Sequence, residues 1–210
     1  CKYIKFNSRR KRIKSCHCNY RINIIMFNEE FIRPFYLDTL NSQEIQEIQE
    51  YICNLKDIDY KHNQIKYEEF DAYRSCEIHY PSSSSIFFRI GKRIFKEMNQ
   101  KYYKYDLKNV YEFQLIKYYE GGNYNWHCDY GISPRKGVVR KLSMTIQLSD
   151  PNDYEGGELQ LIDYGNHTIN VSTKLGTVAV FDAKLPHKVW PVVFGKRISL
   201  VGWASGPRLR

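Results

Sequence analysis

Long apolar runs are missing from this 210-residue sequence, and no segment approaches the length of a membrane-spanning helix. There is also no signal-peptide core followed by a small-residue cleavage site. Cysteine is sparse: six occur in all, and only Cys53, Cys76 and Cys128 fall after residue 25. Their odd number and irregular spacing are typical of reduced thiols rather than of a disulfide framework. We therefore expect a soluble, cytoplasmic protein with no membrane partner.

Acidic residues are absent from the first 25 positions, which hold eight lysines and arginines. The rest of the chain holds 24 basic and 23 acidic side chains, so most of the net charge of +9 belongs to this tail. A nearly neutral remainder argues against a nucleic-acid groove. Because domain-like patterning starts after Met26, we expect residues 1–25 to be a non-native or disordered basic tail and residues 26–210 to be the functional domain. Cys16-His17-Cys18 lacks the second ligand pair of a zinc site.

Two segments have the apolar spacing of amphipathic helices. The first is Phe31–Leu55, with Asn41 or Ser42 as its N-cap. The second is Ile86–Tyr102, which follows a serine-rich loop and has one apolar and one basic side. The polar stretch between them has no clear period, apart from a short candidate strand at residues 74–78.

From Val110 onward the apolar period changes to two, which is typical of half-buried strands. Turn residues separate eight predicted strands: Glu112–Tyr118, Asn125–Asp129, Lys141–Leu148, Glu158–Ile162, Thr168–Val171, Thr177–Asp182, His187–Val192 and Arg197–Trp203. We expect a mainly β fold with flanking α-helices, namely a double-stranded β-helix or jelly roll with its N-terminal helices packed on one sheet. Such a fold brings strands that are distant in sequence together at the barrel mouth.

The chemistry centres on His127 and Asp129, which would leave the same face of an extended strand. An imidazole and a carboxylate presented together suit a divalent transition metal, and His187 is the best candidate for a third ligand. Two histidines and one carboxylate form a facial triad that leaves metal positions open for a co-substrate and oxygen. Three other histidines lack companions at ligand spacing and are expected on the surface or in hydrogen bonds: His62, His79 and His167.

A second candidate pair follows ten residues after His187. Arg197 and Ser199 would share one face of the last strand. The planar guanidinium matches a carboxylate, and the neighbouring hydroxyl can add a hydrogen bond. A carboxylate-bearing ligand could therefore reach from the metal to this arginine. The alternative is that Arg197 pairs with an internal Asp or Glu.

These motifs, in this order, resemble the Fe(II)- and 2-oxoglutarate-dependent dioxygenases. Within them the chain is most similar to the PKHD-type hydroxylases of bacteria and phages, in the prolyl 4-hydroxylase-like branch. The resemblance covers about residues 26–207 and is strongest from residue 112 onward. It is carried by four blocks in addition to His187: Tyr118–Asp129, Arg140–Asp150, Tyr154–Leu159 and Ser199–Trp203.

The resemblance implies a role for each matching position. His127, Asp129 and His187 would ligate Fe(2+), and Arg197 would bind the distal carboxylate of 2-oxoglutarate. Four further side chains would lie around the co-substrate: Tyr118, Tyr124, Ser199 and Trp203. Cys128 has no role in the family and would pack away from the metal.

The implied reaction is hydroxylation of a substrate C–H bond, with O2 consumed and 2-oxoglutarate decarboxylated to succinate and CO2. The resemblance also allows L-ascorbate as a reductant. The substrate would be an unidentified peptide, protein or small molecule; the resemblance favours a peptide or protein side chain, as in prolyl hydroxylation. The segment from Gly131 to Arg140 would be either a lid over the substrate or a surface loop.

Three alternatives stay open. A non-catalytic jelly-roll binding module would not need the three ligands and the arginine together. An oxidative nucleic-acid demethylase would typically carry a second arginine six residues after Arg197, where this chain has Trp203. A zinc hydrolase would leave Arg197 and Ser199 without a purpose.

Overall fold

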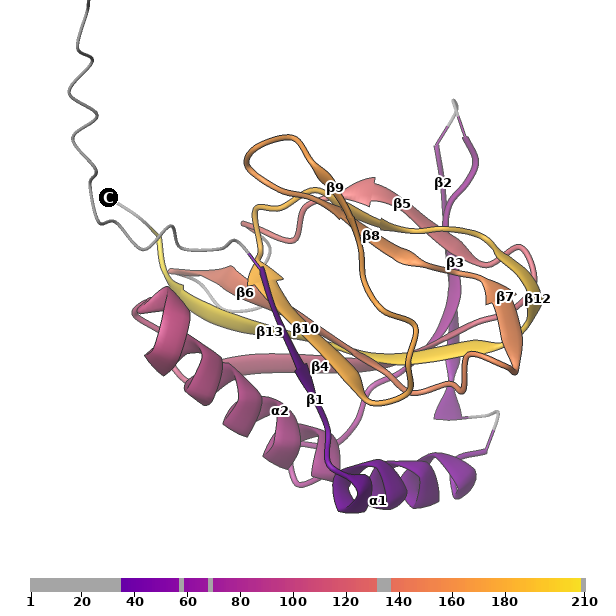
Figure 1. Cartoon of the computed structure of the whole chain (residues 1–210), viewed down its shortest axis with the longest axis horizontal. Helices are drawn as coiled ribbons and strands as arrows, with labels where there is room; N and C mark the ends of the chain where they lie inside the picture. The colour runs from indigo at the N-terminus through magenta and orange to yellow at the C-terminus, as the bar shows by residue number, and fades with distance from the viewer. Residues whose placement is uncertain (1–34, 57–58, 68–69, 132–136, 209–210) are drawn as a thin grey trace, which may run out of the picture. The chain divides into compact units, whose positions relative to one another are not determined.

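A strongly curled antiparallel sheet dominates the computed structural model, which describes residues 35–56, 59–67, 70–131 and 137–208 (Figure 1). Its strands are β1 (Phe35–Thr39), β2 (Lys61–Tyr67), β3 (Phe70–His79), β4 (Val110–Tyr118), β5 (Asn123–His127), β6 (Val138–Gln147), β8 (Leu159–Ile162), β9 (Thr168–Asn170), β10 (Thr177–Asp182), β11 (His187–Val189) and β13 (Arg197–Pro207). Along the sheet the order is β1-β10-β6-β13-β4-β3-β5-β11-β8-β9, and β2 pairs with β3. A separate pair is formed by β7 (Tyr154–Gly156) and β12 (Val192–Gly195). The predicted double-stranded β-helix is therefore confirmed.

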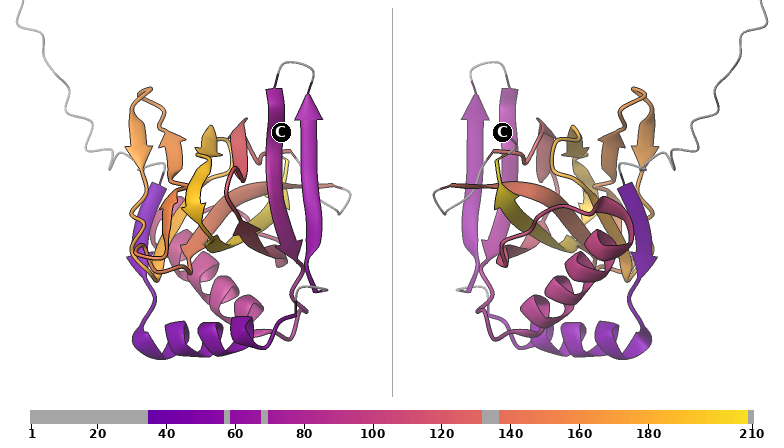
Figure 2. Two further views of the ribbon diagram at one scale, coloured as in Figure 1. Left: turned by 90° about the vertical axis from the view of Figure 1, so that its right-hand side faces the viewer. Right: turned by 90° about the vertical axis from the view of Figure 1, so that its left-hand side faces the viewer.

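Two helices lie on one side of this sheet (Figure 2). The first, α1 (Ser42–Cys53), starts at a capping box in which Asn41 and Glu44 bond each other's backbone N–H groups. The second, α2 (Ile86–Met98), continues into a π-helical turn, η2 (Asn99–Tyr103). Both predicted helices are confirmed, although each is shorter than its apolar pattern.

The helices pack on the sheet because their apolar faces meet the outward side chains of β4, β6, β10 and β13. Phe87, Ile94 and Phe95 of α2 are buried there against Phe113 and its neighbours. Gly91 makes this approach possible, since a Cβ at that position would lie 2.2 Å from the Phe113 ring. A second apolar cluster, including Ile116, Leu161 and Phe181, fills part of the barrel interior. The sheet therefore has a helix-covered outer face and an inner face that is left for the site.

Some predicted boundaries were wrong. Residues 35–39 form β1, which pairs with β10, instead of the first turns of a helix. The polar stretch before residue 70 forms β2, an edge strand whose only partner is β3. The predicted strand His187–Val192 is divided between β11 and β12, and β7 was not predicted. β1 pairs with distant β10, β7 pairs with distant β12, and β2 forms a hairpin with β3. Local periodicity does not report any of these pairings.

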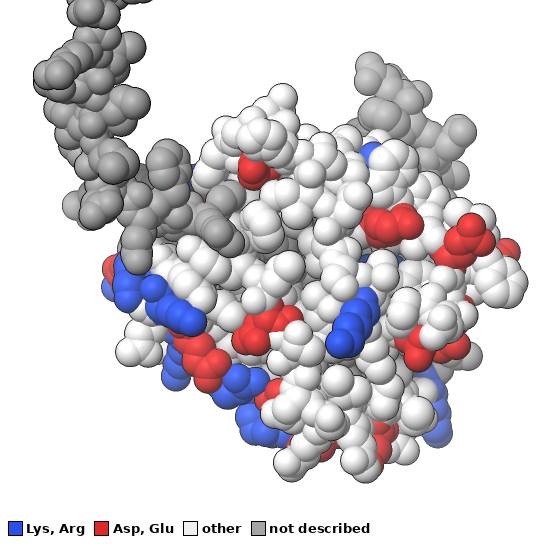
Figure 3. Space-filling view, viewed as in Figure 1, with Lys and Arg blue, Asp and Glu red and all other residues white. Residues whose placement is uncertain are grey.

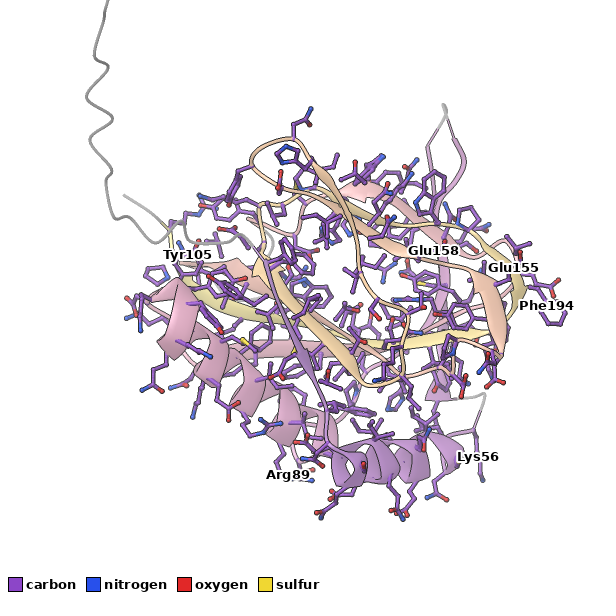
Figure 4. The ribbon with its side chains drawn as sticks, in the orientation of Figure 1. Lys56, Arg89, Tyr105, Glu155, Glu158 and Phe194 are labelled. Carbon is purple, nitrogen blue, oxygen red and sulfur yellow. The ribbon has the colours of Figure 1, made fainter. Side chains whose placement is uncertain are left out.

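The basic side of α2 is partly neutralised by acidic side chains. Arg93 contacts Glu44 at 2.5 Å and Glu97 at 2.9 Å, and Arg89, labelled in Figure 4, pairs with Glu47. On the face drawn in Figure 3, acidic and basic side chains of the described residues are interspersed rather than separated by sign. This mixed face differs from the basic patch that is typical of a nucleic-acid-binding surface.

Several expectations lie partly or wholly outside the described residues. The basic tail of residues 1–25, with its Cys-His-Cys motif, is one of them. The lid or loop predicted after Gly131 is another, because residues 132–136 fall in a gap and Val138–Arg140 belong to β6. Within the described ranges, no helix has the length and apolar character needed to cross a membrane.

Candidate active site

Three side chains that are separated in sequence meet at the end of β5. His127 is the last residue of this strand and His187 the first of β11, and the two are direct partners across the strand pair. Asp129 follows β5, and its backbone N–H donates to the carbonyl of Ala183 at 3.0 Å. One ligand atom from each of the three side chains lies within 4.8 Å of the others. The three residues grouped from the sequence therefore lie together, but Asp129 lies beyond the end of β5 and not on the strand predicted for residues 125–129.

Backbone contacts orient both imidazole rings. The Nδ1 of His127 lies 2.7 Å from the carbonyl of Asn125, and the Nδ1 of His187 lies 2.9 Å from that of Leu185. Because a carbonyl only accepts, each Nδ1 carries the proton and each Nε2 presents a lone pair. The Nε2 atoms lie 4.0 and 3.4 Å from the Asp129 carboxylate. Burial, together with the neighbouring His187, lowers the pKa of His127 to about 3, so this ring is neutral at physiological pH.

The Asp129 carboxylate also has hydrogen-bond partners other than the two histidines. Ser143 of β6 donates its hydroxyl to Oδ2 at 2.7 Å, and the Trp203 side chain adds a further hydrogen bond. Burial alone would raise the pKa of Asp129, but contacts with His187, His127 and Trp203 hold it below its usual range. Two imidazoles and one ionised carboxylate, oriented by outer hydrogen bonds, form a donor set that fits Fe(II).

The other end of the site is built around Arg197, which is 4% exposed. Its Nη1 donates to Ser199 Oγ at 3.1 Å, and its guanidinium is hydrogen-bonded to the Tyr154 hydroxyl, which in turn accepts from Gln147 at 2.7 Å. Among the described residues no carboxylate lies within ion-pair distance of Arg197. Of the two outcomes left open for Arg197, pairing with an internal acid is therefore not found.

The turn between β7 and β8 makes room for this arginine. Gly157 has a φ of +68°, and a Cβ there would lie 2.9 Å from Arg197 Cδ. Glu158, labelled in Figure 4, follows in the same turn, but its side chain is exposed and raises the pKa of Arg197 only as a distant charge. Burial is the larger effect and lowers that pKa. The guanidinium nevertheless stays charged, because arginine is not deprotonated in proteins.

One cavity joins the two ends, and it contains all the side chains assigned to the site from sequence. His127, Asp129 and His187 line it together with the following: Tyr118, Tyr124, Arg197, Ser199 and Trp203. The Tyr124 ring stacks on His127 with centroids 3.5 Å apart. Tyr118 is buried and is the direct partner of Arg197 across β4 and β13. The fold therefore brings every predicted site residue to one place.

Several residues of the site were not predicted from the sequence. Ser143, Thr145 and Gln147 are buried polar residues at alternate positions of β6, and their spacing of two in an otherwise apolar strand was the available signal. Tyr154 and Arg74 had no comparable signal. Cys128 was expected to be packed, but it is exposed, and its thiol donates to the carbonyl of Lys184 at 3.3 Å.

The fold and the site together define a jelly-roll protein with a candidate metal centre of two histidines and one carboxylate. The family model of the 2OG-Fe(II) oxygenase superfamily matches residues 113–205, a range that includes His127, Asp129, His187 and Arg197. Over these residues, which are less than half of the chain, the protein is similar to the 2OG-Fe(II) oxygenase superfamily.

Two curated relatives are also similar in sequence to this chain. A PKHD-type hydroxylase of Janthinobacterium sp. (strain Marseille) is 34% identical over 133 residues, which cover 60% of this chain and 58% of the relative. A PKHD-type hydroxylase of Pseudomonas putida (strain W619) is 37% identical over 93 residues, covering 42% and 40%. The chain thus spans less than two thirds of the length of these relatives.

Two solved structures have the same fold. A Pseudomonas putida prolyl-4-hydroxylase superposes with a TM-score of 0.65 at 19% identity, covering 85% of this chain and 94% of that one. A Trichoplax adhaerens prolyl hydroxylase, in complex with a peptide fragment of the hypoxia inducible factor oxygen degradation domain, gives 0.66 at 16% identity and covers 82% and 83%. At these identities the comparison establishes the double-stranded β-helix and nothing finer.

Proposed function

We propose that this chain is an Fe(II)- and 2-oxoglutarate-dependent dioxygenase that hydroxylates a C–H bond in a peptide or protein side chain. The observation that carries the proposal is the presence of two features in one cavity. These are the donor set of His127, Asp129 and His187, and the buried Arg197, which has no carboxylate partner among the described residues. The match of residues 113–205 to the superfamily model and the similarity to PKHD-type hydroxylases support the same reaction class.

The metal would be held by the Nε2 atoms of His127 and His187 and by the Asp129 carboxylate. Bound Fe(II), with O2 and 2-oxoglutarate, supplies an oxidant strong enough to replace a substrate hydrogen by hydroxyl while the keto acid is converted to succinate and CO2. The protein contributes orientation. The two backbone carbonyls fix the imidazole tautomers, and Ser143 and Trp203 fix the carboxylate.

The co-substrate would be anchored at the closed end of the cavity. Arg197 would take the distal carboxylate of 2-oxoglutarate in a charge-assisted contact, and Ser199 and Tyr154 already hold the guanidinium in place. Tyr118, Tyr124 and Trp203 would line the space between this arginine and the metal. L-Ascorbate as a reductant remains a prediction from the resemblance.

The substrate assignment rests on the relatives. The Trichoplax neighbour is a prolyl hydroxylase bound to a peptide, and the Pseudomonas neighbour is a prolyl-4-hydroxylase. A prolyl side chain in a peptide is therefore the first substrate to test.

The test is anaerobic addition of Fe(II) and 2-oxoglutarate to the metal-free protein. A keto acid chelated to iron gives a weak visible charge-transfer band, which we expect for the wild type. Asp129→Ala should abolish the band, and Arg197→Ala should raise the 2-oxoglutarate concentration needed to form it. Asp163→Ala and Arg89→Ala are the matched controls, because both residues lie away from the cavity lining. Absence of the band, with zinc or no metal bound, would instead favour a hydrolase or a binding module.

A further inference from the structure

A second guanidinium lines the same cavity and has no place in the proposed reaction so far. Arg74 lies on β3, where it is the direct partner of Tyr124 on β5. Its Cζ lies 4.6 Å from the centroid of the Tyr124 ring, and that ring stacks on His127. Arg74 is therefore separated from the candidate metal centre by one aromatic ring.

The contacts of Arg74 are all with neutral groups. Nη2 lies 3.4 Å from the side-chain oxygen of Gln114, which makes a long hydrogen bond. The guanidinium also contacts the Cys76 thiol, whose pKa is raised by burial, so that the thiol stays protonated. The Nε atom is buried and has no hydrogen-bond partner. In the part of the chain that the structure describes, no carboxylate lies within ion-pair distance of Arg74.

Arg74 is half-buried, and among the described residues its guanidinium lacks the acidic partner that usually offsets such desolvation. Arg197 is in the same situation, but the proposed co-substrate supplies its carboxylate. Arg74 and Arg197 reach the cavity at different places. Gln114, which Arg74 contacts, is the partner of Val201, four residues along β13 from Arg197. Val201 and Arg197 are therefore about 13 Å apart along the β13 backbone.

The net charge of the cavity with metal and co-substrate bound also indicates that Arg74 lacks an anionic partner. Its charged lining side chains are Arg74, Arg197 and Asp129. With a divalent metal and the dianion of 2-oxoglutarate bound, the cavity would keep one positive charge in excess. The group that carries this excess is Arg74, on the wall beside the metal ligand His127.

We infer that Arg74 binds a carboxylate of the substrate that is hydroxylated, so that the site selects substrates with an anionic group close to the reacting carbon. This inference rests on the proposed function and narrows its substrate class. The carboxylate could belong to an acidic side chain next to the target residue in a peptide, or to the free α-carboxylate of an amino acid. Both sources present the same chemistry to the guanidinium.

The experiment uses the full chain loaded anaerobically with Fe(II) and 2-oxoglutarate. Two probe pairs are added: blocked tetrapeptides with Asp or Asn before proline, and free L-proline or L-prolinamide. Binding is followed as a perturbation of the charge-transfer band, and turnover as succinate formed after oxygen is admitted. The first pair reports on an acidic side chain and the second on a free α-carboxylate.

We expect at least one acidic probe to bind about ten- to a hundredfold more tightly than its amide. Arg74→Gln, which keeps hydrogen-bond donors but loses the charge, should abolish this preference and leave the 2-oxoglutarate affinity unchanged. Arg74→Lys should restore part of the preference. The control is Arg89→Gln, at an exposed arginine of α2, which should behave as the wild type.

Three results would overturn the inference while the charge-transfer band still forms. These are equal binding of acid and amide, no response to any acidic probe, and a loss of 2-oxoglutarate affinity in Arg74→Gln, which would assign this arginine to the co-substrate. A wild-type protein that forms no band contradicts the proposed function itself, and the inference with it.

Discussion

His127 and His187 face each other as direct partners on β5 and β11, with ring centroids 4.1 Å apart. Burial and the neighbouring His187 both oppose protonation of His127. The fold therefore keeps His127 neutral without a metal, and this has a measurable consequence for the stability of the metal-free protein.

The first prediction concerns pH. The pKa of His127 is lowered to about 3 in the folded protein, whereas an unfolded chain titrates near 6.5. Between these values the unfolded chain holds a proton that the folded protein does not, so stability falls as the pH decreases from about 6.5. Linkage gives a loss of about 2 kcal/mol between pH 7 and pH 5. Urea unfolding of the metal-free protein at both pH values measures it.

The control for this prediction is a second histidine. His127→Gln should flatten the pH dependence of the unfolding free energy, whereas His167→Gln, at an exposed position between β8 and β9, should not. An unchanged pH dependence in His127→Gln would contradict the assignment.

The second prediction concerns the hydrogen bond from Ser143 to Asp129. Ser143→Ala removes the hydroxyl that holds the carboxylate at 2.7 Å, so we expect metal affinity to fall about tenfold or more. Titration with Mn(II), followed by electron paramagnetic resonance, measures this affinity without turnover. Ser205→Ala is the matched control, because Ser205 is equally buried and its hydroxyl has no hydrogen-bond partner. Equal affinities in the two variants would show that Ser143 does not position the ligand.

The third prediction concerns Tyr154, which supports Arg197 from the β7 side. Tyr154→Phe keeps the ring but removes the hydroxyl between Gln147 and the guanidinium. The 2-oxoglutarate affinity should fall about ten- to a hundredfold, the typical effect of one hydrogen bond to a charged group, while metal affinity stays constant. Tyr111→Phe, on the helix-covered side of the sheet, should change neither. Loss of metal binding in Tyr154→Phe would indicate a wider structural role.

The fourth prediction concerns the contact between α2 and the sheet. Gly91→Ala places a methyl group 2.2 Å from the Phe113 ring, so we expect a loss of about 1–3 kcal/mol in the free energy of unfolding. Phe113→Leu should make room for it, so that the double variant is more stable than the sum of the two single effects predicts. Chemical denaturation of the four proteins tests this. Strict additivity would mean that the helix shifts instead of clashing.

The comparison of sequence and structure separates local from long-range information. The helix starts at Asn41 and Ser85 were recoverable because capping residues and apolar spacing act within a few residues. The strand Thr177–Asp182 was predicted with its observed bounds, since turn residues flank it on both sides. By contrast, β2 has no apolar period, and it is defined as a strand by its hairpin pairing with β3.

The candidate site divides in the same way. The sequence by itself determined which residue types are available for a facial triad, His127, Asp129 and His187, and for a carboxylate anchor, Arg197. Only the tertiary structure decided that β5 and β11 are neighbours, that Ser143 holds Asp129, and that Arg74 enters the cavity without an acidic partner. The physical reason is that ligand identity and strand period are properties of short segments, whereas strand order, burial and the pairing of charges depend on how the whole sheet curls.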